Sequence, residues 1–198
     1  MTIAVLKKLC GAIPWCDPSV LEQTLELALE IAREGREGRR IGTLFTLGKA
    51  EPVLAASRPL ILDPLAAHAP ARTHITDPNL RGTIKELAQL DGAFVISDTG
   101  TVVAACRYLD ASVEQIDLPL GLGSRHLAAA SISQRLGAIA IVVSESGVVR
   151  VFHRGEIEAT LIPELWLLDR HHAQLSGLQV NEQPRNVEVL TVELGRHE

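Results

Sequence analysis

The sequence predicts an α/β fold, a mixed central β-sheet flanked by helices within a single domain. Segments with apolar residues at helical spacing alternate along the chain with short apolar segments typical of strands. Two pairs of these short segments are separated by glycine-containing turns, the pattern of antiparallel hairpins. With 198 residues, 46% of them hydrophobic, the chain is long enough to bury one substantial core.

Three helices are predicted from their start and stop signals. Asp17-Pro18 and Asp77-Pro78 each place a capping carboxylate before a proline, the preferred beginning of a helix. The first of these helices is expected to end near Gly35. The third helix is expected to span Ser124–Leu136 and to be closed by Gly137, because glycine readily adopts the backbone conformation that ends a helix.

Most of the strands are predicted in pairs. A single strand is expected at Ile41–Leu47 and a weaker one at Val53–Ala56. The two hairpins are expected to combine Ala93–Ser97 with Thr101–Cys106, and Ala138–Val143 with Val148–Phe152. Residues 57–79 and 110–123 contain prolines and little periodicity, so irregular connections are expected there.

The chain is expected to contain one domain with short additions at both ends. Residues 1–19 form an N-terminal segment with a short helix leading into a turn, and residues 20–164 form the domain. The C-terminal appendage, residues 165–198, could hold a helix at Leu165–Leu175 and a short strand at Val187–Leu194. An appendage of this size is below the length at which a segment usually folds alone.

Composition and charge exclude two classes of partner. The net charge of −5 argues against a general nucleic-acid-binding surface, which needs clustered lysine and arginine. No segment approaches the roughly 20 apolar residues that a membrane span requires, and no secretory signal follows Lys7 and Lys8. Cys10, Cys16 and Cys106 are interpreted as small apolar fillers in a reducing compartment. A cytoplasmic location is therefore expected.

The strongest functional signal is the segment 121–126, Gly-Leu-Gly-Ser-Arg-His, at the start of the third predicted helix. Free backbone N–H groups and the positive end of the helix dipole favour an anion at such a position, and phosphate is the expected anion. Taken alone, the segment is equally compatible with an ordinary helix start capped by a serine.

Four short motifs recur at the ends of predicted strands and helices: Asp91-Gly92-Ala93, Tyr108-Leu109, Gly123-Ser124-Arg125-His126 and Ser144-Glu145. In their order and spacing they resemble the diadenylate cyclase domain, the nucleotide-binding domain of the DNA-integrity-scanning proteins. That family is marked by an Asp-Gly-Ala motif and, further along, a Gly-Thr-Arg-His-Arg motif. The resemblance covers residues 25–160 and implies a single domain of the diadenylate cyclase type.

This resemblance implies that the protein condenses two ATP molecules into cyclic di-AMP with release of two pyrophosphates, using Mg²⁺ or Mn²⁺. Each ATP is both nucleophile, through its 3′-hydroxyl, and electrophile, through its α-phosphorus. A site holding one ATP is therefore half of a reaction centre, and two protomers must face each other in a homodimer or a higher homo-oligomer. Positioning and charge neutralisation can supply most of the catalysis in such a transfer.

The resemblance also assigns roles to residues. Asp91, Arg125 and His126 are implied as catalytic, with Asp91 beside the 3′-hydroxyl and the other two adding charge and donors. Asp91 and Glu145 are implied as metal ligands, since Mg²⁺ prefers carboxylate oxygens and substrate phosphates. The residues implied in nucleotide binding are Gly92, Ala93, Tyr108, Leu109, Gly123, Ser124, Arg125, His126 and Ser144.

Plainer interpretations of the same residues stay open. Without the resemblance, Asp91-Gly92 is a turn between a helix and a strand, and Glu145 is an exposed hairpin residue. Tyr108 is then an amphipathic residue at the end of a strand.

Two positions depart from the family's second motif. Ser124 replaces threonine and keeps the hydroxyl, whereas Leu127 replaces the last arginine and removes a guanidinium aimed at phosphate. Losing one charge-assisted contact costs about 1.5–3 kcal/mol. The alternative function is therefore a catalytically weak or silent module of the same fold that binds ATP or a cyclic dinucleotide, and a third is a structural subunit without nucleotide affinity. Arg107 and Arg154 are candidates to supply the missing charge.

Overall fold

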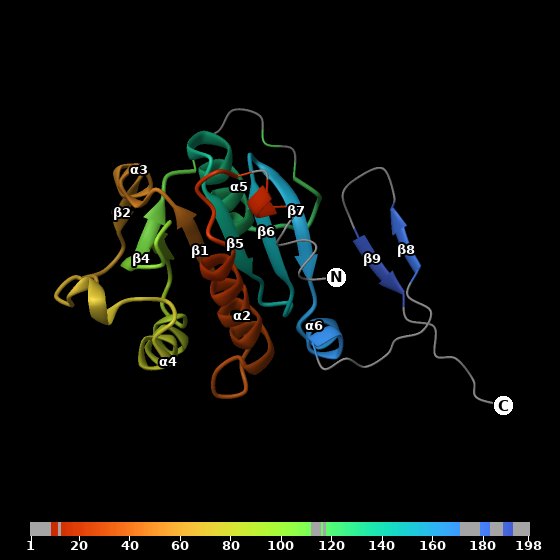
Figure 1. The fold of residues 1–198 in the computed structure, drawn as a ribbon, viewed down its shortest axis with the longest axis horizontal. Coiled ribbons are helices and arrows are strands. Elements are labelled where there is room, and N and C mark those ends of the chain that lie inside the picture. The colour runs from red at the N-terminus through yellow and green to blue at the C-terminus, as the bar shows by residue number, and fades with distance from the viewer. Residues whose placement is uncertain are drawn as a thin grey trace.

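The fold is built on a seven-stranded mixed sheet, in a computed structural model that describes residues 9–11, 13–111, 116, 118–170, 179–182 and 188–191. The strand order is β2-β4-β3-β1-β5-β6-β7, and only β1 and β3 pair in parallel (Figure 1). The strands are β1 (Thr43–Gly48), β2 (Ser57–Pro59), β3 (Ala93–Ser97), β4 (Val102–Leu109), β5 (Ile139–Val143), β6 (Val149–His153) and β7 (Glu156–Leu161). A separate two-stranded sheet pairs β8 (Gln179–Glu182) with β9 (Glu188–Thr191).

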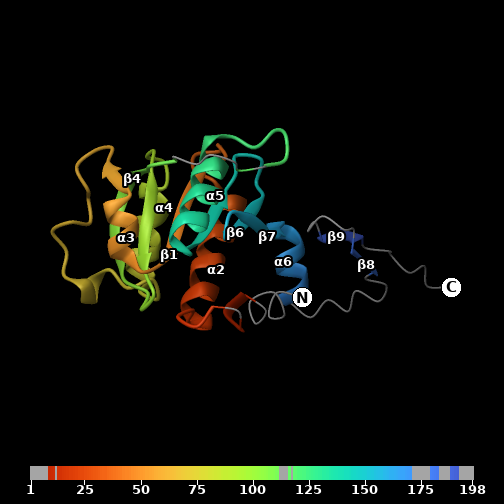
Figure 2. The same ribbon diagram turned by 90° about the horizontal axis from the view of Figure 1, so that it is seen from above.

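Helices cover both faces of the large sheet and divide the core into two clusters. The helices are α2 (Pro18–Glu34), α3 (Ala50–Ala55), α4 (Pro78–Leu87), α5 (Ser124–Leu136) and α6 (Pro163–Arg170), with a short 3₁₀ turn η1 (Pro70–Arg72). One cluster holds the apolar faces of α2 and α4, and the other holds those of α3 and α5. Figure 2 shows α2 and α5 on opposite sides of the sheet.

The central strand, β1, has all six residues buried because it is covered on both faces and paired on both edges. Its Phe45 stacks on Phe94 of β3 with ring centroids 5.2 Å apart. A continuous apolar run of this kind is typical of a strand buried on both faces. The mixed sheet flanked by helices therefore confirms the fold class expected from the sequence.

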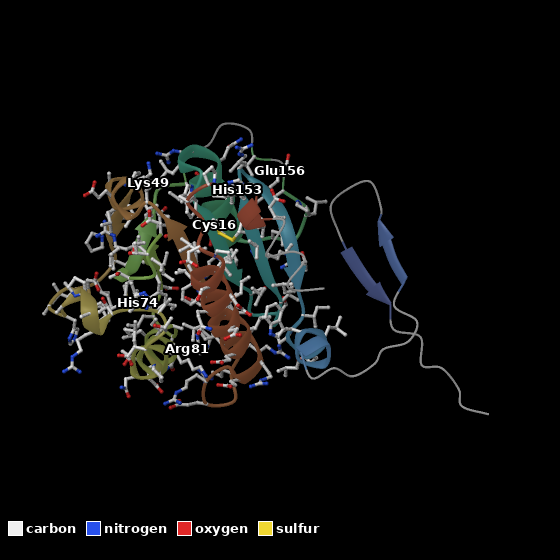
Figure 3. All side chains as sticks on the ribbon, viewed as in Figure 1. Cys16, Lys49, His74, Arg81, His153 and Glu156 are labelled. Carbon is white, nitrogen blue, oxygen red and sulfur yellow. A yellow bond between two sulfur atoms is a disulfide. The ribbon has the colours of Figure 1, made fainter. Side chains whose placement is uncertain are left out.

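The helix starts at Asp17 and Asp77 are confirmed. In each case the carboxylate accepts a hydrogen bond of 2.8 Å from the backbone N–H two residues later, which satisfies a free donor of the first turn. α2 and α4 are joined by Arg81, which donates to the Gln23 carbonyl at 2.9 Å and pairs with Glu30 at 3.1 Å (Figure 3).

The structure differs from the sequence prediction around β2. The weak strand expected at Val53–Ala56 is wrong, because these residues belong to helix α3 and its end. Pro52 lies within the first turn of that helix, where a missing N–H is tolerated. Residues 57–79 were expected to be irregular throughout, but they contain the short edge strand β2 and the turn η1.

The sequence analysis also missed strand β7. Ile157, Ala159 and Leu161 alternate with polar residues, which is a recognisable strand pattern on the edge of a sheet. In the appendage, α6 and β9 overlap the expected helix and strand, while parts of both expected segments lie outside the described residues. The described helices include none that is long and apolar enough to cross a membrane.

Cys10 and Cys16 form a disulfide, drawn as a yellow bond beside the Cys16 label in Figure 3. This corrects the interpretation of all three cysteines as unpaired fillers, which holds only for the buried Cys106. The turn between Cys10 and Cys16 brings their Cα atoms to 5.1 Å, within the range of bridged cysteines. Trp15 in this turn packs against Gly48, where a Cβ atom would lie 3.0 Å from the indole ring.

Phe45→Ala is expected to lower the free energy of unfolding by about 3–5 kcal/mol, because the cavity cannot collapse between two covered sheet faces. Urea denaturation followed by circular dichroism measures the change. Leu62→Ala is the matched control, since its side chain is 94% exposed and its truncation should change the value by no more than about 0.5 kcal/mol. Equal changes in the free energy of unfolding for the two substitutions would contradict the conclusion that β1 is buried at the centre of the core.

Candidate functional site

A cleft of about 860 Å³ lies where β3 begins, β4 ends and α5 begins. Pockets for small molecules have volumes of about 300–1,000 Å³. The residues of the expected site that line it are Asp91, Gly92, Ala93, Tyr108, Leu109, Ser124 and Arg125. Gly123, His126, Ser144 and Glu145 are not among its lining residues. The cleft therefore brings together motifs that are far apart in the sequence.

Arg125 joins the two carboxylates that the sequence analysis singled out. Its Nη2 donates to Oδ1 of Asp91 at 3.1 Å, and its Nη1 donates to Oε1 of Glu145 at 3.1 Å. The side chains of Asp91 and Glu145 are 84% and 67% exposed, whereas that of Arg125 is 35% exposed. Ion pairs this exposed contribute little to stability, so a ligand can exchange them readily.

Gly42, directly before β1, makes room for this ion-pair cluster. A Cβ atom at this position would lie 2.7 Å from Nη1 of Arg125 and 3.2 Å from Cγ of Glu145. Any side chain at position 42 would displace the guanidinium, because the end of the Arg125 side chain is flexible and would move aside. Gly42 is thus a site residue that the sequence analysis did not assign.

Gly92 fixes the backbone on which Asp91 is presented. Its φ is +110°, a conformation that residues with a side chain rarely adopt, and a Cβ atom would lie 2.5 Å from the backbone of Cys106. The glycine therefore allows β3 to start tight against β4, where the pairing has a register shift. This close approach holds Asp91 at the mouth of the cleft.

The first turn of α5 presents unsatisfied backbone donors to the site. Gly123 is the N-cap, no side chain caps this end, and the N–H groups of His126 and Leu127 both reach the Gly123 carbonyl. The earlier N–H groups of Ser124 and Arg125 have no partner within the helix, as at any helix start. Together with the helix dipole, they favour an anion beside Arg125.

His126 points away from the cleft. It is 6% exposed, its ring meets that of Phe152 edge-on at 6.1 Å, and its Nε2 lies 3.3 Å from Nη1 of Arg150. Arginine only donates, so Nε2 must be the acceptor and the ring must be neutral, with its proton on Nδ1. Burial, followed by the charges of Arg150 and Arg125, lowers the pKa of His126 to about 4. The expectation that His126 adds positive charge is therefore wrong at neutral pH.

Tyr108 and Leu109 end β4 on one wall of the cleft. Tyr108 is exposed and carries the guanidinium of Arg58 over its ring at 4.5 Å, whereas Leu109 is buried in the core. Arg107 also lines the cleft, but its guanidinium donates to the Leu54 and Ser57 carbonyls at 3.1 and 2.8 Å. These hydrogen bonds hold the Arg107 guanidinium against β2, so it does not replace the arginine that the family motif has at position 127.

Ser144 and Glu145 belong to the turn between β5 and β6. The Ser144 hydroxyl oxygen accepts hydrogen bonds from the backbone N–H of Ser146 at 3.2 Å and from its hydroxyl at 2.9 Å, with the two hydroxyls able to exchange roles. The turn thus brings Glu145 to Arg125, while Ser144 lies beside the cleft without lining it.

The donor set fits a hard divalent cation that also binds substrate phosphates. Within the described ranges, no group of three or more His, Cys, Asp or Glu side chains could hold a metal ion. Mg²⁺, however, is usually held by one or two carboxylates together with phosphate oxygens and water. Asp91 and Glu145, both exposed and both within reach of one guanidinium, satisfy that requirement.

Comparison with known proteins identifies the family. Residues 30–157 match the family described as DisA bacterial checkpoint controller nucleotide-binding. The chain belongs to this family. The match runs from the end of α2 to the start of β7 and therefore contains strands β1 to β6 and all the residues that line the cleft.

Curated relatives include two archaeal proteins named diadenylate cyclase. The chain is 51% identical to that of Methanocaldococcus jannaschii over 138 residues, which cover 69% of this chain and 43% of the relative. It is 42% identical to that of Haloferax volcanii over 151 residues, which cover 76% of this chain and 55% of the relative. The chain thus spans about half the length of the curated relatives it matches.

Solved structures of similar chains include two from bacteria. A double mutant of DacA from Staphylococcus aureus aligns with a TM-score of 0.48 and 24% identity, over 77% of this chain and 95% of that one. A hypothetical membrane spanning protein from Bacillus cereus aligns with a TM-score of 0.49 and 22% identity, over 70% of this chain and 60% of that one.

His126 is expected to titrate with a midpoint near 4 in the folded protein, because burial disfavours the charged ring and protonation would place a second charge beside Arg150. In the unfolded chain an imidazole takes its proton near pH 6.5. The unfolded state therefore binds more protons between pH 6.5 and 4, and the free energy of unfolding should fall as the pH is lowered through that window.

Two measurements test this expectation. Proton NMR of the His126 ring gives the midpoint directly, and a midpoint at or above 6 would contradict the neutral, accepting ring. Denaturation across the same pH range should show a shallower dependence in His126→Gln than in the wild type. The remaining slope then belongs to other groups such as His153, whose pKa is also lowered by burial.

Proposed function

We propose that this chain is a diadenylate cyclase that condenses two ATP molecules into cyclic di-AMP and releases two pyrophosphates. The observation that supports this most directly is the cluster of Asp91, Arg125 and Glu145 at the mouth of the cleft, next to the free amides of α5. Membership of a family with curated diadenylate cyclases supports the same reaction.

In the proposed reaction, the 3′-oxygen of one ATP attacks the α-phosphorus of the other. An O3′–Pα bond forms, the bond from Pα to the bridging oxygen breaks, and pyrophosphate leaves; the mirror-image step closes the ring. One cleft holds one ATP, so two protomers must face each other. Exposed apolar residues around the cleft mouth, Leu60, Ile61 and Leu90, support a face that is covered in such a homodimer.

Asp91 is the residue proposed to activate the 3′-hydroxyl. Its carboxylate is exposed and accepts a hydrogen bond from Arg125, so it is accessible to a hydroxyl or to a metal ion. When triphosphate enters, phosphate oxygens would compete with Asp91 and Glu145 for the Arg125 guanidinium. That exchange would release the carboxylates for their proposed roles.

A Mg²⁺ or Mn²⁺ ion is the proposed cofactor, with Asp91 and Glu145 as the protein ligands. Such an ion, if bound together with substrate phosphate, would act as a Lewis acid on the phosphoryl group and offset the charge of the leaving pyrophosphate. The chain's own contribution is to hold the two carboxylates near α5 and to orient the nucleotide.

The adenine is proposed to stack on the face of the Tyr108 ring that Arg58 does not cover, with Leu109 closing the apolar wall. The small residues Gly92 and Ala93 leave the floor of the cleft open.

A binding module without efficient turnover is the second candidate. It is favoured by Leu127, which is 41% exposed and lines the cleft where the family motif has its last arginine. An apolar side chain at that point offers nothing to a phosphate. ATP binding without formation of cyclic di-AMP would identify this second function.

Asp91→Asn is expected to reduce cyclase activity by at least about a hundredfold, because the amide neither accepts a proton nor binds the metal as a carboxylate does. The assay incubates the protein with ATP and Mn²⁺ or Mg²⁺ and detects cyclic di-AMP by mass spectrometry. Asp98→Asn, the same substitution at the opposite end of β3, should leave the rate unchanged. Undiminished product from Asp91→Asn would refute the assigned role.

Leu127→Arg is expected to raise the affinity for ATP by roughly ten- to a hundredfold, since it restores a charge-assisted contact of about 1.5–3 kcal/mol. Leu127→Met, which is similar in length but uncharged, is the control. A thermal-shift titration with ATP compares the three proteins. If Leu127→Arg and Leu127→Met behave alike, position 127 does not face the phosphates.

A further inference from the structure

Arg150, on β6, is a half-buried cation without a counter-ion. Its only hydrogen-bonding partner among the residues that the structure describes is the neutral ring of His126, and none of their carboxylates lies within ion-pair distance. Burial lowers the pKa of Arg150, but an arginine stays charged at neutral pH. Buried charges are normally paired, so a half-buried guanidinium without a counter-ion is a candidate partner for a bound anion.

The place of Arg150 in the fold shows where that anion would lie. In the β5–β6 ladder Arg150 is paired with Val142, which precedes Ser144 by two residues. The guanidinium of Arg150 contacts the ring of His126, the third residue of α5. Neither Arg150 nor His126 lines the cleft, so the pair lies behind the first turn of α5 rather than on the cleft wall. Arg125, on the same turn, is already opposed by two carboxylates, so the sum of Asp91, Glu145 and Arg125 is one negative charge. Until a metal ion binds, these three side chains therefore offer a polyphosphate no net positive charge.

We propose that Arg150, held in place by the neutral ring of His126, binds the polyphosphate of the nucleotide beside the first turn of α5. It thereby supplies the guanidinium that the chain lacks at position 127. His126 is then a positioning residue: its Nε2 accepts from Arg150 and directs the remaining donors of the guanidinium toward the Ser144 turn. This inference rests on the proposed nucleotide site but not on cyclisation.

Two other arginines are less suited to this role. The guanidinium of Arg107 is committed to the Leu54 and Ser57 carbonyls. Arg154 lies in the β6–β7 turn, where the backbone N–H of Gly155 donates to the hydroxyl oxygen of Ser133, near the far end of α5. At about 1.5 Å per helical residue, that turn is more than about 10 Å from the helix start.

The test measures binding of inorganic tripolyphosphate, ATP and AMP by isothermal titration calorimetry. Arg150→Gln is expected to weaken tripolyphosphate and ATP by roughly ten- to a hundredfold and to leave AMP, which lacks the polyphosphate, within about threefold. Arg154→Gln, with the same loss of charge at the far end of β6, should bind all three as the wild type does. Arg150→Lys should lie between Arg150→Gln and the wild type, because it keeps the charge but loses the fork of donors.

The positioning role of His126 has its own readout. His126→Phe keeps a ring against Phe152 but removes the acceptor, and it should weaken tripolyphosphate while leaving the melting temperature close to that of the wild type. In the cyclase assay, Arg150→Gln should raise the KM for ATP more than it lowers kcat. Arg150→Lys keeps the test decisive if Arg150→Gln fails to fold, since unchanged tripolyphosphate binding in a folded Arg150→Lys would overturn the inference.

The outcomes separate this inference from the proposed function. If the wild type binds tripolyphosphate and Arg150→Gln does not, the inference stands even if no cyclic di-AMP is formed. If the wild type forms cyclic di-AMP but Arg150→Gln binds tripolyphosphate equally well, the inference is overturned and the cyclase remains. A wild type that does not bind tripolyphosphate also overturns the inference.

Discussion

One guanidinium joins three segments that are distant in the sequence. Arg125, from the first turn of α5, reaches Asp91 before β3 and Glu145 after β5. The cation between the two exposed carboxylates offsets their mutual repulsion. Two glycines make the arrangement sterically feasible: Gly42 leaves space for the guanidinium, and Gly92 lets the start of β3 press against β4. The rest of the sheet serves to hold these three segments in register.

The charged groups around the start of α5 differ in how far they are buried. Asp91 and Glu145 lie at the surface, where water screens them and a ligand can reach them, whereas Arg150 and the neutral His126 lie beneath the helix start. Exposed ion pairs are exchanged at little cost, whereas the half-buried Arg150 has no counter-ion to give up before it binds an anion. A polyphosphate would meet the exchangeable groups first and the unpaired one behind them.

The periodic parts of the fold were predictable from the sequence. The Asp-Pro helix starts, α5, both hairpins and β1 follow from local signals that the structure confirms. Helix α3 was mistaken for a strand because a six-residue segment with one buried position shows no period. The edge strands β2 and β7 are short or half-exposed, so their patterns are weak.

The sequence predicted site residues that belong to short continuous motifs. It did not predict contacts between side chains on different helices and strands. Seven expected residues line one cleft, but the direction of His126 depends on Phe152 and Arg150, which no spacing rule connects to it. Arg150 could have been noticed because it precedes Phe152 by two residues, so the two side chains lie on the same face of the predicted strand. The disulfide of Cys10 and Cys16 was missed because its geometry depends on a turn rather than on a spacing rule.

Both tryptophans of the chain pack against the α2 side of the sheet: Trp15 contacts Gly48, and Trp166 belongs to the same core cluster as α2. The cleft opens toward the other cluster, through Leu44, Ala93 and Leu109. A nucleotide in the cleft would therefore not contact either indole ring, so tryptophan fluorescence does not detect such contact directly. Any spectral change on adding ligand would report a movement transmitted through the sheet, and not occupancy of the cleft itself.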